Sequence, residues 1–399
     1  IYTVKDTLSL HDALPILTNH DYLIANRGVV FDLHVIGDEA PVDDPDQRPG
    51  TDYETLCLLL DVCNRRLDFK SMIHVAGYVP WRYKYTDHQT GDWHAGGRCG
   101  PVPTEWWCTE LLTAYNAWLD ADALEYAAFC NASFFQHFPL EQEYSQEPAA
   151  PRAAVYLDKK ENRPREKNYV VWYVGDYDAA AWLYWNLPRL WTDDNRGAVP
   201  LSWPFNPGLL ERFPFGMHWA RKHATKNDIF IAGDSGAGYV NPRNLSEPRP
   251  HSEYPSGMKL WEETCDRFMN QWGVDTIGFI IDGHTSTMTE EGFAAYARIA
   301  PGGFVFHRHA DSSGIHQGTP WTRYSGDLPM GEDAHDDWIR ELLPQMKPGG
   351  PHFHVFRAVL QSPTFYKEVS ERLRRESEYD VEFVDIPTLM LLLKASLTA

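Results

Sequence analysis

The sequence has no run approaching the 18 or more consecutive apolar residues of a membrane-spanning helix, so we expect no membrane span. Positive charge is also scarce, because 36 Lys and Arg stand against 56 Asp and Glu for a net charge of −20. A surface of this sign repels phosphate backbones. We therefore expect no nucleic-acid partner.

The chain has six cysteines, but no two of them form a CxxC pair, which argues against a zinc knuckle. Cys99 and Cys108 flank a loop rich in Gly and Pro and could pair in an exported protein. The alternative is that the cysteines are buried free thiols. The cysteine pattern therefore leaves the redox compartment open.

The first 16 residues lack the basic segment followed by an apolar segment that defines a signal peptide. Within them, TLSLHDALPI resembles translated sequencing-adapter sequence, as found at the ends of reading frames assembled from environmental DNA. We expect residues 1–16 to be non-native and the natural chain to extend further upstream. Residues 17–399 are then expected to form a single domain, with a possible weak seam at the Pro- and charge-rich segment 142–168.

Apolar residues are plentiful, at 43% of the chain, with charged residues at 23%. This composition is ordinary for a globular protein and supplies a large core. Aromatic residues make up 14%, including 15 Trp and 20 Tyr.

Short apolar runs alternate with longer amphipathic patterns along the chain, which predicts alternating strands and helices. The expected helices are 55–67, 106–119, 179–187, 257–272 and 362–378, the last with Ser362 as N-cap and Pro363 at its first position. The expected strands are 28–33, 72–78, 127–134, 169–175, 198–203, 228–233, 276–282, 303–307, 352–355 and 381–386.

Such alternation favours an α/β fold, either a doubly wound sheet or a (β/α)-barrel. Polar residues follow strand after strand, and in barrels the loops at the carboxyl ends of the strands build the site. We therefore predict a TIM-like (β/α)-barrel with elaborated loops.

Carboxylates stand at the end of the strand 169–175, in the run Gly175-Asp176-Tyr177-Asp178. Asp178 is placed to cap the following helix, which leaves Asp176 as the carboxylate more available for chemistry. The alternative is that both side chains only cap or turn the chain.

A glycine-rich segment, Gly233-Asp234-Ser235-Gly236-Ala237-Gly238-Tyr239, follows the strand 228–233. It is not a dinucleotide-binding loop, because the third glycine is missing and no helix pattern follows at once. It is not a nucleophile elbow either, because Ala237 stands where the second glycine would be. Asp234 is a candidate acid or base, and Gly236 and Gly238 allow the backbone to approach a ligand. A tight structural turn is the alternative.

Histidines and aspartates also end later strands, among them Asp282, His284 and His307. They could hold a catalytic metal, but HExxH and the early HxH of barrel metallohydrolases are missing. We predict no metal and no cofactor, and assign His284 and His307 to hydrogen bonds with substrate. Trp203 and Tyr239 are assigned to packing on sugar rings, whose apolar faces suit aromatic side chains.

The segment Gly236-Ala237-Gly238-Tyr239-Val240-Asn241-Pro242 resembles the motif that names the GxGYxYP family of putative glycoside hydrolases, with Asn241 in place of Tyr. The turn at 175–179 is similar to the family's Asp-Gly-Asp-Asn turn, with Tyr177 for Gly and Ala179 for Asn. The resemblance covers roughly 170–399 well and 17–169 less distinctly. It implies sugar processing by a barrel-like C-terminal domain in an exported polysaccharide-degrading system.

We therefore predict a glycoside hydrolase with a two-carboxylate mechanism acting on a poly- or oligosaccharide, located outside the cell or in the periplasm. Asp176 and Asp234 are the first candidates for the two carboxyl groups, Asp282 is the third, and Asp178 is a helper. A metal-dependent glycan hydrolase or deacetylase and a non-catalytic carbohydrate-binding protein are the alternatives. The oligomeric state stays open.

Overall fold

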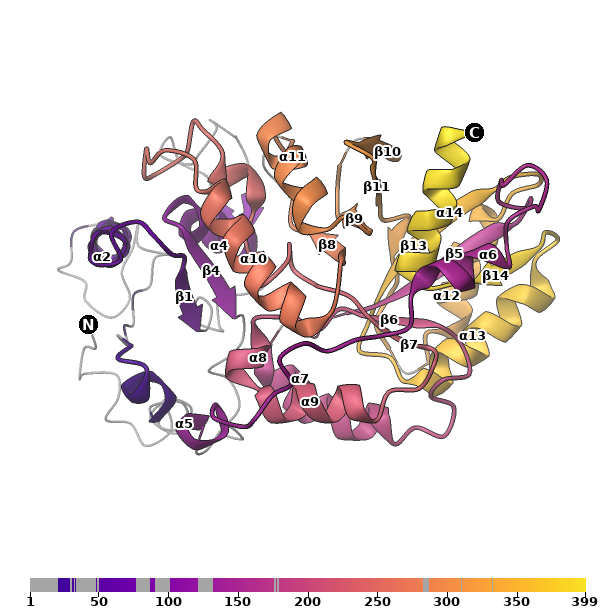
Figure 1. Ribbon diagram of the computed structural model, residues 1–399, viewed down its shortest axis with the longest axis horizontal. Helices are drawn as coiled ribbons and strands as arrows, with labels where there is room; N and C mark the ends of the chain where they lie inside the picture. The colour runs from indigo at the N-terminus through magenta and orange to yellow at the C-terminus, as the bar shows by residue number, and fades with distance from the viewer. Residues whose placement is uncertain are drawn as a thin grey trace.

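The computed structural model describes residues 21–28, 31, 33, 48, 50–76, 87–89, 101–120, 132–175, 177, 179–282, 287–309, 311–331 and 333–399. Elongated in outline, the molecule places α2, β1 and β4 at one end and α12, α13 and α14 at the other (Figure 1).

A six-stranded sheet lies at the centre, and all its pairs are parallel. Its strands are β12 (Gly326–Asp327), β13 (His352–Val359), β5 (Asn168–Gly175), β6 (Leu201–Trp203), β7 (Asp228–Phe230) and β14 (Val381–Phe383), which also pairs with β5. The sequence of β5, NYVVWYVG, is almost uninterruptedly apolar, and all eight residues are buried. Burial on both faces is what a parallel sheet covered by helices requires.

A second sheet has the order β10-β11-β9-β8, with bounds Ser313–His316, Thr319–Arg323, Gly303–Phe306 and Thr276–Ile280. Further hydrogen bonds join it to the first sheet at two places. Ala232, just after β7, forms a parallel bridge with Ile277 of β8. On the other side, the Tyr324 N–H donates to Phe306 O (3.0 Å) and the Ser325 N–H donates to Val355 O (2.8 Å). The stretch 319–327 therefore pairs with β9 through its first half and with β13 through its second half.

Helices pack against these strands (Figure 1). They are α7 (Ala180–Trp191), α8 (Leu209–Arg212), α9 (Pro214–Lys222), α10 (Met258–Trp272), α11 (Glu290–Ile299), α12 (His335–Leu342), α13 (Pro363–Glu376) and α14 (Ile386–Thr398), with short 3-10 turns η2 (Pro242–Leu245) and η3 (Leu343–Gln345). Ser362 caps α13 as predicted, because its Oγ accepts a hydrogen bond from the Phe365 N–H at 3.1 Å.

The earlier part of the chain forms smaller units. These are α2 (Thr51–Arg66), a parallel pair of β1 (Ile73–Ala76) and β4 (Ala117–Asp120), an antiparallel pair of β2 (Asp87–Gln89) and β3 (Pro101–Pro103), and the helices α4 (Thr104–Ala114), α5 (Ala132–Phe135) and α6 (Ala149–Ala154). The predicted helix 106–119 is wrong at its end, because Asn116 has a φ of 56° and residues 117–120 pair with β1. The strand expected at 127–134 is also wrong where it is described, since Ala132 begins α5.

Alternate residues of β5 enter two different hydrophobic clusters. Tyr169, Val171 and Tyr173 pack in one cluster with side chains of β8, β9, β13 and α14. Val170, Trp172 and Val174 pack in the other, with residues of the covering helices. The mixed α/β class with a parallel sheet is thereby confirmed.

Candidate functional site

Four polar side chains meet where β8, β9, β12 and β13 end. Asp327 connects two of the others, because its Oδ2 lies 3.2 Å from His307 Nε2 and its Oδ1 accepts a hydrogen bond from Arg357 Nη1 at 3.3 Å. The fourth is Asp282, whose Oδ1 accepts the backbone N–H of Arg308 at 2.8 Å. Neighbouring parallel strands bring their carboxyl ends to one edge, which explains how residues 75 positions apart in the sequence come together. We call Asp282, His307, Asp327 and Arg357 the strand-end cluster.

Aromatic rings form the wall of the strand-end cluster. The His307 ring stacks on Trp106 of α4 at a centroid distance of 5.2 Å and lies 4.9 Å from Phe279 of β8. The Arg357 guanidinium lies 5.6 Å from the Phe279 ring centroid. These contacts fix the positions of the His307 and Arg357 side chains and keep the surroundings of the carboxylates partly apolar.

The carboxyl group of Asp282 keeps its proton to a higher pH than that of an ordinary aspartate. Burial raises the pKa of its carboxyl group, and the hydrogen bond from the Arg308 N–H offsets this only in part. A carboxyl group that keeps its proton to higher pH is suited to act as a general acid.

The pKa of Asp327 moves in the opposite direction. Partial burial raises it, but the hydrogen bond from His307 and the positive charge of Arg357 outweigh that effect, so the net shift is downward. The side chain is 48% exposed, so solvent reaches the ionised group. Two carboxyl groups that share the neighbour His307 and have opposite pKa shifts are the pattern expected of an acid and a base in one site.

Three of the predicted site residues, Asp176, Asp178 and His284, lie outside the described residues. Their neighbours do locate one end of the site. A Cβ atom on Gly175, the last residue of β5, would lie 3.6 Å from Arg357 Nε. The carboxyl end of β5 therefore adjoins the strand-end cluster.

Asp234 is buried, with 4% of its surface exposed, and has a φ of 45°. The next residue connects its loop to β8, because the Ser235 N–H donates to Phe279 O at 2.7 Å. Asp234 thus lies at the same edge of the strands as Asp282.

The two glycines expected to approach a ligand make room for neighbouring protein atoms. A Cβ on Gly238 would lie 2.3 Å from the Trp118 ring and 2.9 Å from Leu119 O. A Cβ on Gly236, where φ is 133°, would lie 2.6 Å from Cys265 Sγ. The motif is therefore a packed turn between β4 and α10, and its glycines are required by that packing.

Tyr239 and Trp203 were both expected to contact a sugar. Tyr239 is partly buried, and its backbone forms an antiparallel bridge with Leu119. Trp203 is fully buried, and its Nε1–H donates to Asp228 Oδ1 at 2.9 Å. Because its ring packs among Tyr177, Trp191 and Phe205, Trp203 offers no surface to a substrate and is a core residue.

Asp327 and Trp106 were missed by the sequence analysis. Asp327 follows the strand 319–323, whose sequence TPWTR lacks the apolar run that predicts a strand, so the sequence predicts no strand end there. Trp106 was expected at the start of a helix, and nothing in the sequence places that helix beside β9.

The described residues contain no group of three or more His, Cys, Asp or Glu arranged to hold a metal.

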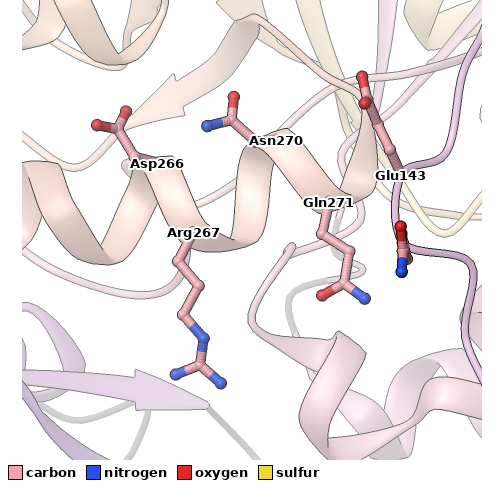
Figure 2. A pocket seen from close by; sticks show the side chains of 6 residues that line it. Glu143, Asp266, Arg267, Asn270 and Gln271 are labelled. Atoms are coloured by element: carbon pink, nitrogen blue, oxygen red, sulfur yellow. The ribbon is translucent and has the colours of Figure 1, made fainter.

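A shallow depression of about 400 Å³ lies elsewhere, on the outer surface of α10. Figure 2 shows Asp266, Arg267, Asn270 and Gln271 projecting from this helix near Glu143. Because the chain turns directly from the end of α10 into the start of β8, these residues lie toward the amino ends of the strands. The depression is therefore separate from the strand-end cluster.

Residues 166–331 match the model of the GxGYxYP putative glycoside hydrolase C-terminal domain. The predicted resemblance to the family is confirmed over this segment. Asp234, Asp282, His307 and Asp327 lie inside the matched segment, whereas Arg357 lies beyond it.

Among solved structures, the chain is similar to a putative hydrolase from Bacteroides thetaiotaomicron VPI-5482, with a TM-score of 0.56 and 15% identity over 73% of this chain and 55% of that one. The chain thus shares the fold of that hydrolase and spans about half of the hydrolase's length. An uncharacterized protein from Agrobacterium tumefaciens C58 matches with a TM-score of 0.35 and 11% identity, over 63% of this chain and 100% of that one. The search of curated proteins gave no match.

No helix among the described residues is both long and apolar enough to cross a membrane.

Proposed function

We propose that the protein hydrolyses glycosidic bonds of a poly- or oligosaccharide with two carboxyl groups at the carboxyl ends of its strands. The observation that carries this proposal is that His307 acts on two carboxyl groups, Asp282, whose pKa is raised, and Asp327, whose pKa is lowered. The family of the segment 166–331 supports a sugar substrate.

In the proposed reaction, the Asp282 carboxyl donates its proton to the glycosidic oxygen as the bond to the anomeric carbon breaks. The Asp327 carboxylate either attacks the anomeric carbon or takes a proton from the attacking water. His307 and Arg357 keep Asp327 ionised at the pH where Asp282 keeps its proton. Asp176 and Asp234 stay predicted as further carboxyl groups of the site, with Asp178 as a helper, and His284 and Tyr239 as substrate contacts.

We also propose that the strands form a (β/α)-barrel. Parallel pairing runs from β8 through β9 to the stretch 319–327, then through β13, β5, β6 and β7, and back through Ala232 to β8. The cluster that holds alternate residues of β5, β8, β9 and β13 would then be the barrel interior. In such a fold the site is expected at the carboxyl ends of the strands, where the strand-end cluster lies.

The test is release of reducing ends from a panel of plant, host and microbial polysaccharides. We expect wild-type release that survives EDTA and falls at least about 10²-fold in Asp282→Asn and in Asp327→Asn. Asp266→Asn is the matched control, because burial also raises the pKa of Asp266 but its carboxyl lies on the outer surface of α10.

Normal turnover by both site variants would refute the assignment. Loss in Asp266→Asn alone would move the site to the depression of Figure 2. Loss of wild-type release in EDTA would indicate a metal-dependent hydrolase, and binding without any product would indicate a carbohydrate-binding protein.

A further inference from the structure

We infer that Ser235 is a positioning residue that fixes Asp234 and Asp282 relative to each other. The inference rests on the proposed function for its catalytic meaning. Its structural basis is that Ser235 is fully buried and uses its N–H, its hydroxyl and its carbonyl in four hydrogen bonds.

Two of these bonds hold β8 just before Asp282. The Ser235 N–H donates to Phe279 O at 2.7 Å, and the Ser235 Oγ accepts the N–H of Ile281 at 2.9 Å. Ser235 directly follows Asp234, and Ile281 directly precedes Asp282. One side chain therefore connects the residues adjacent to two candidate carboxylates.

The hydroxyl replaces a backbone partner at the point where the chain leaves the sheet. Ala232 still bonds to β8 through its own backbone, from its N–H to Thr276 O and from Gly278 N–H to its O. Asp234 and Ser235 then take positive φ values of 45° and 74°, which turn the backbone away from an extended path. The Ser235 Oγ supplies the acceptor for Ile281 that the turned backbone no longer offers.

The other two bonds hold the turn itself. The Ser235 hydroxyl donates to Val240 O at 2.8 Å, and Val240 lies in the motif at 236–242. The Tyr296 hydroxyl of α11 donates to Ser235 O at 2.7 Å and accepts the Nε1–H of Trp261 at 3.1 Å. Residues in sparsely populated backbone conformations persist where the surroundings over-determine them, and such strain is concentrated at functional sites. Because its hydroxyl is buried and donates its hydrogen bond to Val240 O, Ser235 is a scaffold residue and not a nucleophile.

The test compares Ser235→Ala with Ser370→Ala. Ser370 is also fully buried, and its Oγ likewise donates to a backbone carbonyl, that of Tyr366, and accepts one N–H, that of Trp172. It lies on α13, away from the carboxyl ends of the strands. Each variant loses one donated and one accepted side-chain hydrogen bond, so we expect similar falls in Tm.

We expect Ser235→Ala to lower kcat by about 10²-fold with KM changed less than about threefold, because misplacement of reacting groups by about 1 Å has effects of this size. Ser370→Ala should keep kcat within about twofold of wild type. A second readout needs no substrate: in ¹³C NMR titrations of the aspartate carboxyl groups, the Asp282 signal, assigned with Asp282→Asn, should move its midpoint toward that of an ordinary aspartate in Ser235→Ala and stay in place in Ser370→Ala.

Equal kcat values and equal Asp282 midpoints in the two variants would overturn the inference, even if Asp282→Asn is inactive and the proposed function stands. If wild type releases no sugar from any glycan, the proposed function fails, and the Asp282 titration still decides whether Ser235 positions this carboxyl group.

Discussion

At the residue scale, the character of the site depends on which neighbour each aspartate has. Asp282 has buried surroundings and one backbone donor, whereas Asp327 has an imidazole and a guanidinium. The same side chain is therefore pushed toward its neutral form in one place and toward its charged form in the other. The pH dependence of the reaction should report this difference.

We predict a bell-shaped pH profile for kcat/KM, rising as Asp327 ionises and falling as Asp282 loses its proton. Arg357→Gln removes a charge that lowers the pKa of Asp327, so the rising limb should move to higher pH while the falling limb stays. His307→Phe keeps a ring beside Trp106 but removes an interaction that lowers both pKa values, so both limbs should move to higher pH. The pH profiles of the two variants measure this, and a limb that moves to lower pH would contradict it.

Burial of the Asp282 carboxyl group should also lower the free energy of unfolding at neutral pH. Because the pKa of Asp282 is raised in the folded protein, its contribution favours folding at low pH and is lost as the pH rises through that pKa. Asp282→Asn keeps an acceptor for the Arg308 N–H and removes the ionisable group. We expect a higher Tm than wild type at pH 8 and no gain at pH 3, measured by calorimetry. A gain at pH 3 alone would contradict this sign.

At the element scale, the glycine motif is a turn shaped by two neighbours. We predict that Gly238→Ala destabilises the protein by about 1–3 kcal/mol, because the added methyl group would meet both the Trp118 ring and the backbone oxygen of Leu119. Gly326→Ala is the control, since its Cβ would meet nothing closer than 3.8 Å. Denaturant unfolding of both variants checks this, and equal losses would show that the motif tolerates a side chain.

At the scale of the whole molecule, the C-terminal helix is held by a segment from the middle of the chain. Asp385 is buried, caps α14 by accepting the Thr388 N–H at 2.9 Å, and pairs with Arg152 of α6 through bonds of 2.9 and 3.1 Å. The following residues of α14, such as Leu389 and Leu393, pack against alternate residues of β5. This pair therefore joins segments 233 positions apart in the sequence.

We predict that Arg152→Met lowers the free energy of unfolding by about 3 kcal/mol, because it leaves the Asp385 carboxylate buried without its partner. Adding Asp385→Asn should recover part of that loss, since the amide oxygen still accepts from Thr388 and no charge stays buried. A double-mutant cycle measured by denaturant unfolding gives the coupling. Strictly additive losses would mean that the pair does not act as a unit.

The sequence by itself determined the elements whose residues carry their own signals. The apolar run of β5 and the cap at Ser362 gave the class and several boundaries, because burial on two faces and helix capping depend on local residue order. The motif at 236–242 led to the family whose model matches the segment 166–331. The strand ends of β8 and β9 also led to Asp282 and His307.

Only the tertiary structure decided which polar residues meet and which aromatic residues are exposed. Asp327 joins the site because the stretch 319–327 changes its pairing from β9 to β13, and no local pattern encodes that change. Trp203 is equally aromatic whether it lies in the core or on a surface, and its burial follows from the helices packed around it. The pKa of each aspartate likewise depends on distant neighbours, since desolvation and charge act through space and not along the chain.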